Sequence, residues 1–274
     1  MPELPEVETV RRTLLPALGA TITGVTTSGK LLRLGAKVPV PALRKLIGAR
    51  LVGVRRIGKY LLVDTDRGAA ILVHLGMSGR LRVTAATDLP APHTHVQIAL
   101  DGARELRFSD PRRFGSVDVV TPSGEMTHAS LRVLGPDPIT SVVDGAHLYA
   151  RSRGRRTPLK VFILDQAVLA GVGNIYASEA LWRAGLRPTR QAATLTATRA
   201  GQLASAIRAV LEHALEHGGT TLRDFVDADG SAGEHADYLD VYGRDGQPCP
   251  RCTRAIRRTV LGGRATYDCT CCQR

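Results

Sequence analysis

The pattern of apolar and polar residues changes along the chain from short apolar runs to longer helical ones. Near the start, Val7, Val10, Leu14 and Leu18 recur at helical spacing and predict one N-terminal helix. Residues 21–120 then hold short runs rich in β-branched residues, broken by Gly and Asp, which predict antiparallel strands joined by turns. The predicted strands are Leu51–Val54, Tyr60–Asp64, Ala70–His74, Leu81–Val83, His95–Leu100, Glu105–Phe108 and Gly115–Val120.

The second half of the chain is predicted to be mainly helical. A Gly-Pro-Asp-Pro sequence at residues 135–138 breaks the pattern and is our candidate linker. Apolar residues at a period near 3.6 predict a helix over Thr196–His217, which Gly218 and Gly219 end. The polar, glycine-containing stretch Leu222–Asp240 is expected to be a mobile loop. The chain is therefore expected to be an α+β protein, with a β-sandwich or barrel followed by helices.

Composition narrows the class of partner. The 274 residues carry 37 Lys and Arg against 25 Asp and Glu, a net charge of +12, which favours a polyanionic partner such as nucleic acid. No apolar run approaches the roughly 20 residues of a membrane span, so no membrane partner is expected. Because the first residues include three glutamates and no apolar segment, we expect no signal peptide and an intracellular, soluble protein.

The five cysteines all lie near the C-terminus and predict one structural zinc ion. Cys249 and Cys252 form one C-x2-C pair, and Cys269 and Cys272 form a second, on either side of a predicted hairpin. Four thiolate ligands leave no open coordination position, so the zinc would be structural. Cys271 permits a C-x-C alternative, but the x2 turn is the better chelating geometry, and Cys271 is interpreted as a spare thiol.

The N-terminus offers a candidate nucleophile. Removal of the initiator Met1 would expose Pro2 as a secondary amine, with Glu3 and Glu6 within one turn of it. A free α-amine has a pKa of about 7.7–8.0, so part of it is nucleophilic near neutral pH. Its attack on an aldehyde-level carbon gives an iminium, which is an electron sink. A Met-Pro start followed by acidic residues is also typical of an ordinary helix N-terminus.

Several motifs, in order, resemble the formamidopyrimidine-DNA glycosylase family of bacteria, which excises 8-oxoguanine and ring-opened purines. They are PELPEVETVRR at the start, GMSGR at 76–80, DPRRFG at 110–115, GVGNIYASEALWRAG at 171–185, GGTTLRDF at 218–225, and VYGRDGQPC with the closing cysteines. The resemblance implies an N-terminal β-sandwich catalytic domain over residues 1–134. It further implies a helical domain with a helix–two-turn–helix over 135–240, and a zinc finger over 241–274.

The resemblance also implies catalytic roles. Pro2 would attack C1′ of the damaged nucleotide, and Glu3 would transfer protons to and from the deoxyribose ring oxygen. Glu6 would order the N-terminal turn or help with protons. Lys59 and Arg264 match the family residues that hold the phosphate backbone beside the lesion, and the arginine would assist elimination.

Other matched residues are expected to bind DNA. Met77, Arg112 and Phe114 match the three residues that fill the gap left by an extruded base. Asn174 matches the helix–two-turn–helix asparagine, at a helix start that offers N–H groups to a phosphate. The weaker backbone positions are His74, His93, Lys160 and Tyr242, of which both histidines are equally explained as structural.

The chain departs from relatives in two places. Arg153–Arg156 is Arg-rich where many relatives are Lys-rich. In the lesion-recognition loop, Thr220, Thr221 and Arg223 match, but Asp227–Tyr238 does not, so the lesion preference does not transfer in detail.

The resemblance implies double-stranded DNA with oxidised purines or abasic sites as the substrate of a monomeric, cytoplasmic bacterial enzyme. Three alternatives stay open. An endonuclease VIII-type glycosylase would share the fold but prefer oxidised pyrimidines. A damage-binding homologue would keep the fold without catalysis, and a generic zinc-finger module would not need a reactive N-terminus.

Overall fold

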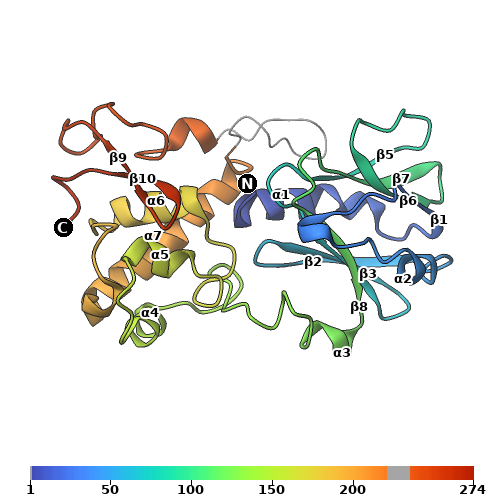
Figure 1. Ribbon diagram of the computed structural model, residues 1–274, viewed down its shortest axis with the longest axis horizontal. Helices are drawn as coiled ribbons and strands as arrows, with labels where there is room; N and C mark the ends of the chain where they lie inside the picture. The colour runs from blue at the N-terminus through green and yellow to red at the C-terminus, as the bar shows by residue number, and fades with distance from the viewer. Residues whose placement is uncertain (1, 221–234) are drawn as a thin grey trace. The chain divides into compact units, whose positions relative to one another are not determined.

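The computed structural model describes residues 2–220 and 235–274, and the chain forms two compact units. The first unit holds residues 2–132 together with 218–220, and the second holds Val133–His217 and His235–Arg274. Each is described by itself below (Figure 1).

The first unit contains two antiparallel four-stranded sheets, in the orders β1-β6-β7-β5 and β2-β3-β4-β8. One hydrophobic core joins residues from the inner faces of both sheets, so they form a sandwich. Helix α1 (Leu4–Thr13) packs Val7 and Val10 into this core. The strands are β1 (Ile22–Thr27), β2 (Leu51–Ile57), β3 (Tyr60–Thr65), β4 (Ala70–His74), β5 (Arg80–Ala85), β6 (Thr94–Leu100), β7 (Arg104–Ser109) and β8 (Ser116–Val120). Short helices are η1 (Leu15–Ala17), η2 (Arg33–Gly35), α2 (Val40–Arg44) and α3 (Pro122–Glu125).

The second unit is helical and ends in a β-hairpin. Its longest helix, α7 (Ala197–Glu216), begins at the N-cap Thr196, whose side chain accepts a hydrogen bond from the Arg199 N–H. The other helices are α4 (Gly145–Ser152), α5 (Leu159–Leu164), α6 (Asn174–Arg183), η3 (Ala192–Thr194) and η4 (His235–Tyr238). Strands β9 (Arg257–Leu261) and β10 (Arg264–Asp268) pair as the hairpin.

The predicted α+β class is confirmed. All seven predicted strands are present, and the N-terminal helix and α7 lie where the apolar spacing placed them. Strand β1 was not predicted, because its exposed threonines and Gly24 blur the alternation. Part of the predicted loop Leu222–Asp240 is helical, since His235–Tyr238 forms η4. The three-domain division with boundaries at 134 and 240 stays a prediction. No helix within the described residues is long and apolar enough to cross a membrane.

Candidate functional site

The N-terminal turn is buried and held by its own carboxylates. Pro2 is buried, and Glu3 is the N-cap of α1 with 2% of its surface exposed. Glu3 and Glu6 form a capping box, in which each side chain accepts a hydrogen bond from the other residue's backbone N–H. The reciprocal bonds fix the orientation of the Glu3 carboxylate directly beside Pro2.

Glu6 joins this turn to the chain at Thr220. Its Oε2 accepts from the Glu3 N–H at 2.7 Å, and its Oε1 accepts from the Thr220 N–H at 2.7 Å. Gly219 permits this approach, since its φ is +82° and a Cβ there would lie 2.7 Å from Glu6 Oε1. The geometry therefore supports an ordering role for Glu6. Thr220 is buried, whereas Thr221 and Arg223 lie outside the described residues.

Lys59 and His74 belong to the same β-sheet. Lys59 is buried in the turn between β2 and β3, and the neighbouring Tyr60 pairs with His74 across β3 and β4. His74 Nδ1 accepts from the Gly76 N–H at 3.0 Å, which places the ring proton on Nε2. Burial, reinforced by the positive charges of Arg33 and Lys59, lowers the pKa of His74 to about 3. His74 is therefore neutral at pH 7, as a structural histidine would be.

A buried carboxylate ties together the two loops that carry the proposed gap-filling residues. Asp110 Oδ1 accepts from Ser78 Oγ at 2.6 Å, and Asp110 Oδ2 accepts from the Gly115 N–H at 2.7 Å. The loops touch closely, because a Cβ on Gly76 (φ +66°) would lie 2.4 Å from the Gly115 nitrogen. The Asp110 N–H also donates to the carbonyl of His93, an exposed residue with a φ of +64°. Sequence reasoning missed Asp110 and Ser78 as positioning residues, although both lie in quoted motifs.

Met77, Arg112 and Phe114 come together at the surface of the first unit. Met77 is 36% exposed and Phe114 is 46% exposed, so both large apolar side chains are open to solvent. The Arg112 guanidinium lies over the Phe114 ring, 4.9 Å from its centroid. All three line a hollow of about 680 Å³, together with His74 and Arg33. The structure thus presents an apolar wedge and a cation on one surface.

In the second unit, two polar side chains, of Asn174 and the buried Lys160, donate hydrogen bonds to the hairpin. Asn174, the first residue of α6, donates from Nδ2 to the Ala265 carbonyl at 3.0 Å. Lys160 Nζ donates to the same carbonyl at 2.8 Å and to Thr266 Oγ1 at 3.0 Å. Lys160 is fully buried, so its role is better explained as positioning the hairpin than as contacting DNA directly. Arg264, at the start of β10, is exposed.

Glu179 organises the chain that leads into the cysteine cluster, a role that sequence reasoning missed. Its carboxylate accepts three backbone N–H hydrogen bonds, from Asp240, Val241 and Tyr242, at 2.7 to 3.0 Å. Tyr242 is thereby held with its ring against Tyr267, at a centroid separation of 4.9 Å. Burial raises the pKa of Glu179 to about 7, although the three backbone donors favour its ionised form.

The raised pKa of Glu179 predicts an unusual pH dependence of stability. Between pH 4.5 and 7 the unfolded chain ionises Glu179 more readily than the folded chain, so rising pH favours unfolding. Relative to Glu179→Gln, which cannot titrate, the wild type should lose about 3 kcal/mol of unfolding free energy across this interval. Urea unfolding of the wild type and of Glu179→Gln at several pH values measures this change in unfolding free energy. The control is Glu212→Gln, which changes an exposed glutamate. A pH-independent difference from Glu179→Gln would contradict the raised pKa.

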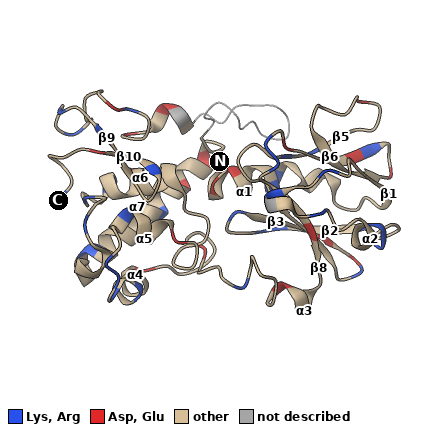
Figure 2. Cartoon of the chain, in the orientation of Figure 1, with Lys and Arg blue, Asp and Glu red and all other residues tan. Residues whose placement is uncertain are grey.

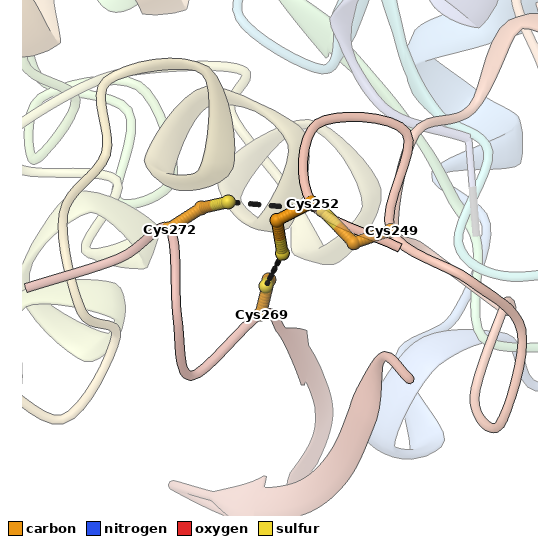
Figure 3. A group of neighbouring side chains, drawn as sticks. All are labelled: Cys249, Cys252, Cys269 and Cys272. Atoms are coloured by element: carbon orange, nitrogen blue, oxygen red, sulfur yellow. Dashed lines mark hydrogen bonds between the residues drawn. The ribbon is translucent and has the colours of Figure 1, made fainter. Parts of the chain in front are cut away.

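Four cysteines form a cluster that can bind a metal ion. The sulfurs of Cys249, Cys252, Cys269 and Cys272 all lie within 4.8 Å of one another (Figure 3). Two of the separations are 3.9 Å, between Cys249 and Cys272, and 3.4 Å, between Cys252 and Cys269. Four Zn–S bonds of 2.3 Å in a tetrahedron place the sulfurs about 3.8 Å apart, so the set fits zinc.

The cysteine cluster is backed by an apolar layer, and the spare thiol lies apart from it. Trp182 of α6 and Ile256 pack with the buried Cys249 and Cys269. Cys271 is exposed and does not belong to the cluster, which agrees with the x2 pairing predicted from the sequence.

Comparison with known proteins identifies the family. The family model for the formamidopyrimidine-DNA glycosylase N-terminal domain matches residues 1–117, and that for the H2TH domain of the same family matches residues 134–226. The formamidopyrimidine-DNA glycosylases of Stenotrophomonas maltophilia (strain R551-3) and Xanthomonas euvesicatoria are 50% and 48% identical to the chain, with both chains covered completely.

Solved structures agree with the sequence relatives. The MutM (Fpg) protein of Thermus thermophilus superposes with a TM-score of 0.89 at 42% identity, covering 99% of this chain and 98% of that one. A Lactococcus lactis Fpg variant bound to DNA containing Fapy-dG gives a TM-score of 0.91 at 30% identity, with 99% of each chain covered. The chain therefore belongs to the formamidopyrimidine-DNA glycosylase family.

Proposed function

We propose that this chain is a bifunctional DNA glycosylase and AP lyase of base excision repair, which removes 8-oxoguanine and formamidopyrimidines. Family membership establishes a DNA glycosylase of this type. The observation that carries the detailed proposal is the buried N-terminal turn, where Pro2 adjoins a carboxylate fixed by the capping box.

In the proposed first step, the Pro2 nitrogen forms a bond to C1′ of the damaged nucleotide and loses its N–H proton. The bond from C1′ to the base breaks, and the base leaves with the electron pair and takes up a proton. Removal of Met1 is required, because an amide nitrogen is not nucleophilic. Glu3 delivers a proton to the deoxyribose ring oxygen, so that the ring opens as the iminium between Pro2 and C1′ forms. Glu6, which accepts hydrogen bonds from Glu3 and Thr220, positions this turn.

In the proposed second step, the iminium draws electrons from C2′, and a C2′ proton is lost. The 3′ C–O bond to phosphate then breaks by β-elimination. Loss of the C4′ proton from the conjugated iminium then allows the 5′ C–O bond to break by δ-elimination, and each phosphate leaves with the electron pair. A one-nucleotide gap with a phosphate at each end results. Lys59 and Arg264 would hold the flanking phosphates, with Arg264 assisting the departure of the leaving group.

Binding of the damaged duplex requires extrusion of the lesion from the base stack. The exposed Met77 and Phe114 suit insertion into the gap, and the Arg112 guanidinium suits hydrogen bonds to the orphaned cytosine. The backbone N–H groups at the start of α6, near Asn174, suit a phosphate. His93, Tyr242 and Thr220 are proposed as further contacts. Lys and Arg residues occur in both units (Figure 2) and account for the net charge of +12.

Zinc is proposed as the ion held by Cys249, Cys252, Cys269 and Cys272. With four thiolates it has no open position and serves only to fix the hairpin that carries Arg264. We propose that the protein acts as a monomer in the bacterial cytoplasm.

Cleavage of defined duplexes tests the proposed substrate class. A duplex with one 8-oxoguanine opposite cytosine should be cut to a one-nucleotide gap in preference to a matched duplex with thymine glycol. Preference for thymine glycol would reassign the chain to the endonuclease VIII type. Binding of 8-oxoguanine DNA without cleavage, by protein lacking Met1, would leave a damage-binding protein.

A further inference from the structure

A second group of metal-ligating side chains lies in the helical unit, apart from the cysteines. His213, His217 and His235 each offer a ring nitrogen, and these three atoms lie within 4.8 Å of one another. The separations of the ring centroids are 4.4 Å for His213 and His217, 5.2 Å for His213 and His235, and 6.2 Å for His217 and His235. Nothing in the proposed glycosylase chemistry uses these residues.

Two of the histidines lie at the C-terminal end of helix α7. His213 is in its last turn and His217 is the C-cap residue, and their rings are neighbours. His217 Nδ1 donates to the His213 carbonyl oxygen at 2.8 Å. That bond fixes the tautomer and leaves Nε2 of His217 with its lone pair. A hydrogen bond from the second ring nitrogen to a backbone carbonyl is typical of histidines that bind metals.

The third histidine is buried, and one of its ring nitrogens has no hydrogen-bond partner in the part of the chain that the structure describes. His235, in η4, is 3% exposed, and its Nδ1 has no hydrogen-bond partner among the described residues. A buried polar atom without a partner costs about 1–3 kcal/mol, so the ring contacts with Tyr176 and Tyr238 do not by themselves explain this placement. A metal ion at the centre of the three rings would give a buried imidazole a partner.

The hollow beside the imidazoles contains one carboxylate that could complete a metal site. His213 and His235 line this hollow of about 260 Å³ together with Glu179, Asp240 and Arg183. Because three backbone N–H groups already bind Glu179, Asp240 is the carboxylate available to an ion, with Arg183 beside it. Tetrahedral bonds of 2.0–2.1 Å require nitrogens about 3.3 Å apart, whereas these lie within 4.8 Å of one another. Side-chain rotations that shorten the separations by up to about 1.5 Å would therefore be needed to bind an ion.

We propose that His213, His217 and His235 form a second metal site, which binds a divalent transition ion of the Zn²⁺ and Ni²⁺ class and links the end of α7 to η4. Three imidazoles leave a fourth coordination position, which water or the nearby Asp240 would fill. Imidazole sites of this kind select borderline ions over the hard cation Mg²⁺.

Calorimetric titration of Ni²⁺ into untagged, full-length protein that already carries one equivalent of zinc tests the proposal. One further equivalent should bind, Mg²⁺ should not compete, and X-ray absorption at the nickel edge should report nitrogen ligands without sulfur. His217→Gln and His235→Gln should each weaken Ni²⁺ binding at least about tenfold. His128→Gln, which changes a partly buried histidine in the other unit, should leave it unaltered.

Three results would overturn the site. They are the absence of a second bound equivalent of Ni²⁺, a Ni²⁺ affinity of both His217→Gln and His235→Gln equal to that of the wild type, and sulfur ligands at the nickel. The last would place the ion in the cysteine cluster. His213→Gln is a further variant on the helix, where Gln is well tolerated, so a folding failure of His235→Gln would not obscure the outcome.

Discussion

Glu3→Gln is expected to lower the rate of base excision by about 10²–10⁴-fold, the usual contribution of a general acid or base. The substitution keeps the shape of the side chain and an oxygen that can accept the Glu6 N–H, so the capping box and helix α1 should persist. It removes the group that would transfer a proton to the deoxyribose. Single-turnover excision of 8-oxoguanine measures the effect, with circular dichroism to verify the fold.

The matched control for Glu3 is Glu8→Gln on the same helix. Glu8 binds Arg11 and Arg56, and these charges hold its pKa below the usual value despite partial burial. Its loss should weaken the ion pairs yet leave excision within a few-fold of wild type. If Glu3→Gln and Glu8→Gln lowered the excision rate equally, the role of Glu3 would be to stabilise the helix. If Glu3→Gln kept full activity, Glu3 would have no part in the mechanism.

Cys249→Ser is expected to abolish zinc binding at the cysteine cluster and to disorder the hairpin. Zinc contributes about 10–16 kcal/mol to the folding of isolated zinc-finger peptides at pH 7, so the loss of one thiolate is severe. Cys249 is also buried with Trp182 and Ile256, which ties the hairpin to α6. The zinc content should fall from one equivalent to near zero, and affinity for a lesion-containing duplex should fall with it.

Cys271→Ser is the matched control, because Cys271 adjoins a cluster residue but is exposed and outside the cluster. Its zinc content and DNA affinity should equal those of the wild type. Unchanged DNA affinity in Cys249→Ser, with zinc shown to be absent, would remove the hairpin from the DNA-binding surface. Loss of zinc in Cys271→Ser would favour the C-x-C ligand choice instead.

The sequence predicted those features that arise from a local pattern of residues. Short apolar runs such as Tyr60–Asp64, bounded by turn residues, located the strands, and β3 is indeed buried on both faces. Helical spacing located α7, because this pattern reflects burial of one face. The C-x2-C pairs likewise predicted the cysteine cluster, since each pair occupies one local turn. The weakly alternating β1 escaped detection, because its polar threonines resemble a loop.

The features that the sequence did not predict depend on contacts between distant residues. Lys160 is buried only because the hairpin, more than a hundred residues later, supplies Ala265 and Thr266 as hydrogen-bond acceptors. Glu179 similarly meets backbone donors some sixty residues away. A pattern of single residues contains no information about such pairs, so buried polar residues are where sequence analysis fails most readily.

The N-terminal nucleophile is tested by borohydride trapping on a duplex with one 8-oxoguanine opposite cytosine, using protein shown to lack Met1. Borohydride reduces an iminium to a stable amine, which links the protein covalently to DNA. We predict an adduct that peptide mapping places on Pro2. The absence of an adduct, or an adduct on Lys59 in place of Pro2, would contradict the N-terminal nucleophile.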